Sequence, residues 1–129
     1  MPISDRKISR PAAHRTNITA ADAGPDISNP TGALTLDNQM HVECSVECSA
    51  GAVTGIICLA RWDKDGNFMG ITEMQTFTAH SLWQTGRGFA TPPLIFDVMG
   101  ATKVRAFVSS LSGGNITNLY LIPLSLYNN

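Results

Sequence analysis

Charged residues are scarce in this 129-residue chain, in which nine Lys+Arg and ten Asp+Glu make up 15% of the sequence, against roughly 25% in an average globular protein. Long apolar runs are missing as well, and none approaches the ~18–20 residues that span a bilayer. The opening MPISDRK lacks the apolar core of a secretion signal. The length suits one domain and excludes a multidomain enzyme. We expect a single domain with no membrane partner.

Catalytic signatures are also missing. The chain has no Gly-x-Ser-x-Gly elbow and no phosphate-binding glycine loop. Glu43 and Glu47 would lie ~13 Å apart on one strand, beyond the usual separation of a glycosidase pair. We therefore predict no catalytic residue, no cofactor and no small-molecule substrate, and we expect a protein that is not an enzyme.

The three cysteines and His41 raise the alternative of a zinc site. Cys44 and Cys48 would be ~13 Å apart along a strand, too far to form a disulfide with each other, although either could meet Cys58. Zinc ligands usually gather on tight turns, whereas a straight strand spreads them and points His41 to the opposite face. We predict no metal site and interpret the cysteines as small buried residues in a reducing compartment.

The N-terminal segment is basic and cannot form a core. Residues 1–15 carry four basic residues and one acidic residue, whereas residues 16–129 carry five basic and nine acidic ones. Four prolines and isolated isoleucines leave residues 1–35 too little apolar surface to order themselves. We expect an extended arm over 1–35 and a folded domain over 36–129. The arm would lie along neighbouring chains, because 35 residues can reach ~100 Å, or fold back on its own body.

The basic residues of this arm are candidate partner-binding residues: Arg6, Lys7, Arg10 and Arg15. Four charges would bind nucleic acid only weakly, and no aromatic residues interleave with them to stack on bases. Contact with an acidic protein surface is favoured, since the rest of the chain is net acidic. The C-terminal residues 106–129 carry no charge at all. Two interpretations stay open for them, a strand in the middle of a sheet and a subunit interface.

The body of the chain predicts β-strands. Residues 41–48 alternate strictly between Val or Cys and polar residues, which is the period of a half-buried strand. Residues 63–67 (DKDGN) form a hairpin turn rather than a calcium loop, because Gly and Glu are missing at the required positions. Further strands are expected at 53–62, 68–79, 94–99, 103–111 and 116–126. The prediction is an all-β fold, a single antiparallel β-sandwich that is jelly-roll-like, with a five-stranded barrel as the fallback.

The longest irregular stretch, residues 80–93, holds a possible ligand loop. His80, Trp83 and Arg87 could bind a sugar if Trp83 were exposed, whereas a buried Trp83 would instead plug one end of the fold. The alternative function that follows is a carbohydrate-binding β-sandwich module.

One stretch carries a family resemblance. Residues 93–108 (PLIFDVMGATKVRAFV), followed by the turn and strand start at 112–117 (SGGNIT), resemble a β-sandwich module of tailed-bacteriophage head-decoration (cement) and fibre accessory proteins. The resemblance covers about 25 residues of the chain and carries no active site.

The resemblance implies a non-enzymatic structural protein of the virion, made in the host cytoplasm and placed on the capsid surface. Its partners would be the major capsid protein and further copies of itself, as a dimer or trimer, with the arm clamping neighbours by multivalent contacts. A tail, fibre or neck accessory protein is the alternative within the virion. Deleting residues 1–30 would then leave a folded body that no longer attaches to particles.

Overall fold

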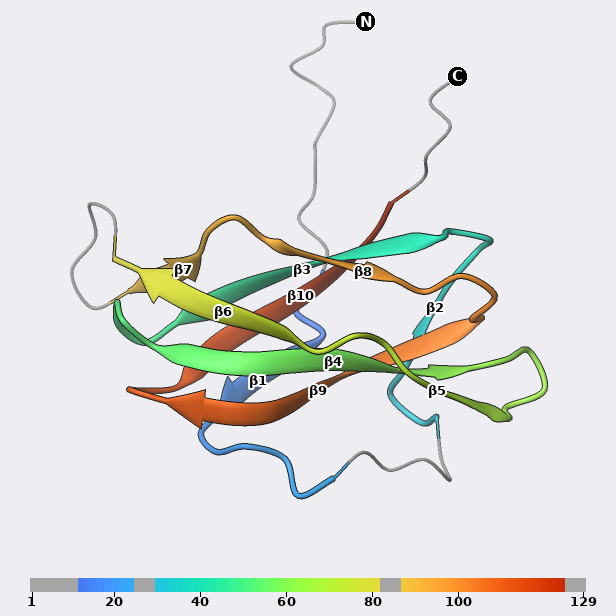
Figure 1. The fold of residues 1–129 in the computed structure, drawn as a ribbon, viewed down its shortest axis with the longest axis horizontal. Helices are drawn as coiled ribbons and strands as arrows, with labels where there is room; N and C mark the ends of the chain where they lie inside the picture. Colours follow the sequence, from blue (N-terminus) through green and yellow to red (C-terminus); the bar gives the residue numbers. More distant parts are fainter. Residues whose placement is uncertain (1–11, 25–29, 82–86, 125–129) are drawn as a thin grey trace, which may run out of the picture.

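The computed structural model describes residues 12–24, 30–81 and 87–124, and it is built from antiparallel strands (Figure 1). The all-β prediction is confirmed. The described residues contain no helix, and so none that is long and apolar enough to cross a membrane. Their ten strands are β1 (Arg15–Ile18), β2 (Leu34–Thr35), β3 (His41–Cys48), β4 (Thr54–Trp62), β5 (Phe68–Ile71), β6 (Gln75–His80), β7 (Gly88–Ala90), β8 (Leu94–Asp97), β9 (Lys103–Ser112) and β10 (Ile116–Leu124).

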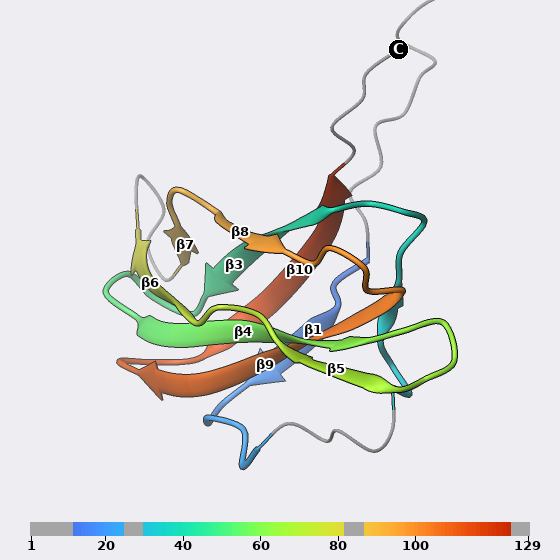
Figure 2. The ribbon, with the colours of Figure 1, turned by 45° about the vertical axis from the view of Figure 1, so that its right-hand side comes forward.

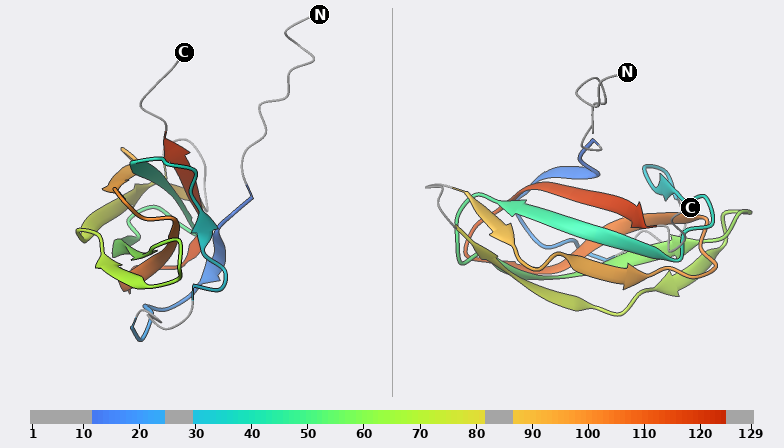
Figure 3. Two further views of the ribbon diagram at one scale, coloured as in Figure 1. Left: turned by 90° about the vertical axis from the view of Figure 1, so that its right-hand side faces the viewer. Right: turned by 90° about the horizontal axis from the view of Figure 1, so that it is seen from above.

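The strands form one antiparallel sheet that curls on itself into a half-barrel. One half runs β1–β10–β3, with β7 and β8 both pairing with β3; the other half runs β2–β9–β4, with β5 and β6 both pairing with β4. Pairing of β6 with β7 joins the halves. The end-on view in Figure 3 shows the two halves facing each other around a common interior.

The interior is filled by the inward-facing residues of both halves. Alternation along β3 buries Val42, Cys44 and Val46 completely or nearly so, as a period of two requires. Phe96, from β8 in the same half, and Leu59, from β4 in the other half, belong to the same buried cluster. Gly55 on β4 has no room for a side chain, because a Cβ there would lie 2.5 Å from the Ser110 carbonyl oxygen and 2.6 Å from the Phe77 ring.

The expected strand 68–79 is interrupted in the structure. Between the pairs Ala60↔Ile71 and Ile57↔Gln75, four steps along one strand oppose three along β4, so residues 72–74 form a bulge. Buried Thr72 fixes this bulge. Its main-chain amide donates to the Leu59 carbonyl, and its hydroxyl accepts the Leu59 amide, both at 2.9 Å.

The extended arm expected over 1–35 is not confirmed. Two segments of this range are strands of the sheet: β1 pairs with β10, and β2 pairs with β9. The His14 amide also donates to the Leu119 carbonyl at 2.8 Å. The sheet itself therefore supplies the ordering surface for the described part of the N-terminal range. Residues 1–11 and 25–29 lie outside the described residues.

The described part of the uncharged C-terminal segment, residues 106–124, lies within the sheet. β10 lies between β1 and β3, and Leu119 and Leu121 are buried. This agrees with the interpretation of a central strand, and it accounts for the missing charges without a subunit interface. Figure 2 shows β10 running diagonally between β3 and β1.

Candidate functional site

The predicted partner-binding and ligand residues do not form one cluster in the described structure. Arg6, Lys7, Arg10 and Trp83 lie outside the described residues. His80 is exposed at the end of β6, beside a shallow hollow lined by residues 51–52 and 78–81. Arg15 and Arg87 each bind a carboxylate of the same chain. The described residues instead offer four groups to consider: the 12–24 segment, which contains Arg15; Glu47 with its partners Arg87 and Asn118; the cysteines; and an exposed apolar patch.

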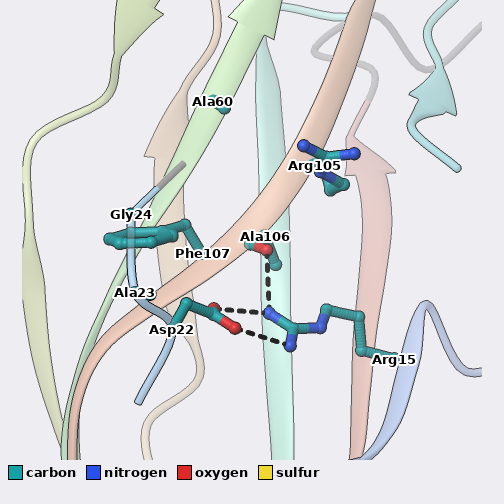
Figure 4. A pocket seen from close by; sticks show the side chains of 8 residues that line it. All are labelled: Arg15, Asp22, Ala23, Gly24, Ala60, Arg105, Ala106 and Phe107. Atoms are coloured by element: carbon teal, nitrogen blue, oxygen red, sulfur yellow. Dashed lines mark hydrogen bonds and ion pairs between the residues drawn. The ribbon is translucent and has the colours of Figure 1, made fainter. Parts of the chain in front are cut away.

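Arg15 fastens the 12–24 segment rather than projecting toward a partner. Its guanidinium binds both carboxylate oxygens of Asp22, at 2.7 and 2.9 Å, and donates to the Ala106 carbonyl at 3.2 Å. Figure 4 shows the Arg15 and Asp22 side chains meeting beside β9, with Arg105 directed away from them. A two-point Arg–carboxylate pair fixes both groups in one geometry. The structure therefore gives Arg15 an intramolecular role.

The same segment satisfies the outer edge of β9 without forming a strand there. His14 Nε2 accepts the Ala106 amide at 3.1 Å, and the Asp22 carboxylate accepts the Val108 amide at 2.8 Å. The Asp22 amide donates to the Val108 carbonyl at 2.8 Å. Main-chain groups that a neighbouring strand would normally bond are thus bound by residues 14–22. An edge covered in this way is closed to pairing with another chain.

A hollow of about 330 Å³ lies between this segment, β9 and β4 (Figure 4). Its polar lining is already engaged: Arg15 binds Asp22, and Arg105 donates to the Thr31 carbonyl at 2.9 Å. The Arg105 guanidinium also lies 5.3 Å from the centre of the Trp62 ring. These groups stabilise the segment that covers the edge of β9, and the charged residues that line this hollow are bound within the chain.

Electrostatics at the 12–24 segment favour neutral His14 and ionised Asp22. Burial, followed by the positive charges of Arg15 and Arg105, lowers the pKa of His14 from 6.5 to about 4. Burial alone would raise the pKa of Asp22, but the hydrogen bonds from Arg15 and the Val108 amide hold that pKa below its ordinary value. Neutral His14 keeps the lone pair that the Ala106 amide requires.

Arg87 is the ion-pair partner of a buried carboxylate, that of Glu47. Glu47, on β3, is only 6% exposed, and its two oxygens accept hydrogen bonds from Arg87 Nη2 and, at 3.0 Å, from Asn118 Nδ2. The Arg87 guanidinium also packs 5.4 Å from the centre of the Phe89 ring. Arg87 thus compensates a buried negative charge, whereas the sequence suggested a ligand role. The strict alternation of residues 41–48 placed Glu47 on the polar face and gave no sign of this partner.

Arg87→Ala is expected to lower the free energy of unfolding by about 1 kcal/mol, because it removes a partner of buried Glu47, whereas the half-exposed position of Arg87 lets water screen the pair. Adding Glu47→Gln should recover part of this loss, since a neutral amide needs no cation. Urea unfolding of the four proteins of this cycle measures both effects. Additive losses would show that the two side chains do not interact.

The three cysteines are buried free thiols. Burial raises the pKa of Cys44 to about 12 and that of Cys48 to about 11, and it raises the pKa of Cys58 as well. Thiols of this kind are poor nucleophiles, because the reactive thiolate is disfavoured. Within the described parts of the chain, no three His, Cys, Asp or Glu side chains gather as metal ligands would.

The most distinctive surface feature is an exposed apolar patch, made of Met69, Ile71, Met74, Ile95 and Met99. Met69 and Ile71 come from β5, Met74 from the bulge after it, and Ile95 and Met99 from β8 and the turn that follows. No sequence signal identified it, because these residues lie far apart in the sequence, in two different expected strands.

The two sides of the patch are held together by side chains. Arg61 donates to the carbonyls of Met69, at 3.2 Å, and Met99, at 3.4 Å. Gln75 Nε2 donates to the Ile95 carbonyl at 2.5 Å. No strand pairing joins β8 to β5 or β6 among the described residues. The patch therefore lies over an opening of the half-barrel that only side chains bridge.

Comparison with known proteins adds no assignment, because the chain matches no family model, no curated protein and no solved structure. The engaged arginines, the buried thiols and the exposed apolar patch are features of packing and contact.

Proposed function

We propose that this chain is a non-enzymatic structural protein of a virus particle, a decoration or cement protein that joins major capsid subunits and further copies of itself. The observation that carries the proposal is the exposed apolar patch, because side chains of this kind gather where a protein binds another protein. The resemblance of residues 93–108 to phage head-decoration modules is the reason for proposing a virus particle. This stretch includes Ile95 and Met99 of the patch.

The fold suits such a contact. The two halves of the sheet share one hydrophobic core, which supports the patch on rigid strands, and the proposal includes a jelly-roll-like sandwich as the fold. The chain carries few charged residues, which lowers the desolvation cost of burying its surface against neighbouring proteins. A homo-oligomer, dimer or trimer, on the capsid surface follows from the proposal.

A tail, fibre or neck accessory protein would use the same patch, and the copy number per particle separates the two: hundreds for a shell protein and few for a tail component. The carbohydrate-binding alternative is not proposed. Arg87, which would have supplied the sugar donor, is bound to Glu47.

The test of the proposal is a double variant of the patch, Met74→Asp with Ile95→Asp. Two buried charges at an apolar contact should weaken binding to purified particles at least tenfold, or ~1.4 kcal/mol, while the fold persists, because both side chains are exposed. Co-sedimentation with particles measures binding, and circular dichroism checks the fold.

Thr76→Asp is the matched control, since Thr76 is exposed on β6 and lies outside the patch. It should bind as the parent does. If the double variant binds as tightly as Thr76→Asp, the patch is not the contact. Deleting residues 1–30 is no longer a clean test of the arm, because it removes β1 and Asp22; deleting residues 1–11 spares every described strand.

A further inference from the structure

The exposed apolar patch is continuous across two strands that do not pair. A Cβ on Gly100 would lie 3.4 Å from the Met69 Cε, which places the turn after β8 against β5. The Gln75–Ile95 hydrogen bond brings Met74 beside β8 in the same way. The patch is therefore one surface that runs along the edge of β8 with which no described strand pairs.

The patch is small enough for a peptide segment of a partner to cover it. Exposed fractions of 37–57% on five side chains correspond to roughly 400–500 Å² of surface, within the range of functional patches. A stable interface between folded proteins buries about 800 Å² on each partner. An extended segment needs less area, because it can also bond to the unpaired edge of a strand.

The charged residues beside the patch indicate which charge the bound segment should carry. Glu73, beside Met74, and Asp97, between Ile95 and Met99, are both exposed. Arg61 adds one positive charge, but its guanidinium is directed at the carbonyls of Met69 and Met99. A fitting segment carries apolar side chains for the patch and basic side chains for the two carboxylates.

We infer that the occupant is residues 1–11 of a neighbouring copy of this chain. The inference rests on the proposed function and names the partner of its contact surface. The sequence of this segment, MPISDRKISRP, offers Ile3 and Ile8 to the patch and Arg6, Lys7 and Arg10 to Glu73 and Asp97. No other stretch of the chain combines isolated isoleucines with three basic residues.

The place where the segment joins the body lies at the same end of the sheet as the patch. In register with β10, the residues before β1 head toward Leu124, at the end of the sheet where β8 also ends. The proposed function joins copies of this chain, so a neighbouring copy is the inferred acceptor, and the patch of the same chain is the alternative that the experiment below separates from it. Eleven residues span at most about 36 Å, enough to cover the patch of an adjacent copy.

Isotope-mixed cross-linking tests the inference. Full-length protein grown in ¹⁴N is mixed equally with protein grown in ¹⁵N, and a carbodiimide couples amines to carboxylates in contact with them. The expected products link Lys7 to Glu73 or Asp97, and about half of them join a light to a heavy chain, as random pairing between chains requires. Mass spectrometry of the digest counts them.

The variant Ile3→Asp with Ile8→Asp keeps Lys7 and should lose these products at least tenfold, whereas Ser4→Asp with Ser9→Asp, its charge-matched control, should retain more of them. Products that join only chains of one isotope would overturn the inference in favour of docking on the same chain. An absence of Lys7 products at the patch would overturn it as well. The proposed function could survive either result, because Met74→Asp with Ile95→Asp would still weaken binding to particles.

Discussion

Trp62→Ala is expected to lower the free energy of unfolding by about 4 kcal/mol, the range found when a fully buried large aromatic is truncated. Trp62 ends β4 with no exposed surface, and its ring meets the edge of Phe68 at 6.0 Å between centres. The Arg105 guanidinium covers the same ring. The substitution leaves a cavity and removes the surface on which Arg105 rests.

Trp62→Phe should recover more than half of that loss, because a ring still fills the site. The matched control is Ile71→Ala, on the neighbouring strand β5, where a 38% exposed side chain should cost below about 1 kcal/mol. Urea unfolding followed by far-UV circular dichroism is the measurement, since fluorescence would change with the tryptophan itself. A loss under 1.5 kcal/mol for Trp62→Ala would mean that its covering residues are not fixed in solution.

Local patterns in the sequence predicted the longer strands β3, β4, β9 and β10, but not the short strands β1, β2 and β7. Residues 41–48 form β3 within the predicted bounds, because a strict period of two is a property of the strand alone. The turn at 63–67 forms as expected: the Asp63 carboxylate accepts the amides of Asp65 and Asn67, and Gly66 adopts a positive φ of 83°. Neither feature needs information from distant residues.

Contacts between distant residues were not predictable in the same way. The 12–24 segment is ordered by bonds that join residues 86 to 92 positions apart in the sequence, such as His14 with Ala106 and Asp22 with Val108. Its own composition indicated only that it could not form a core. The surfaces that order it are β10, with which β1 pairs, and the edge of β9, and no local pattern in the sequence places the segment against either of them.

The predicted roles of side chains at the candidate site were wrong for the same reason, because they depend on contacts between distant residues. Arg15 and Arg87 were interpreted as free to bind a partner or a ligand, because a sequence shows a cation but not its carboxylate. Asp22 and Glu47 supply those carboxylates, and Glu47 lies 40 residues from Arg87. The apolar patch escaped notice because its residues become one surface only when β5 and β8 face each other.

Acid is expected to destabilise the protein through the 12–24 segment. The pKa of His14 is about 4 in the folded state against 6.5 for an unperturbed imidazole, so the unfolded chain binds more protons between these values. Stability is therefore greatest above pH 6.5 and falls as the pH drops toward 4. The lowered pKa of Asp22 acts in the same direction, since its contribution is lost as the pH falls through its folded value.

The expected loss between pH 7 and pH 4 is about 2 kcal/mol. A pKa difference of this size would give ~3.4 kcal/mol for a fully buried group, and the partial exposure of His14 reduces it by solvent screening. Protonation also removes the acceptor of the Ala106 amide. The β9 edge should therefore open first, and amide hydrogen exchange at Ala106 and Val108 should quicken before that of Leu119 in β10.

His14→Gln tests the cause, because glutamine offers an oxygen to the Ala106 amide and does not titrate in this range. Its free energy of unfolding, measured in urea at pH 7, 5.5 and 4, should fall by less than half as much as that of the parent. The control, His80→Gln, changes an exposed side chain on β6 far along the chain from this segment, and it should keep the parental slope. An unchanged slope in His14→Gln would assign the acid sensitivity to other groups and remove His14 from the closure of the β9 edge.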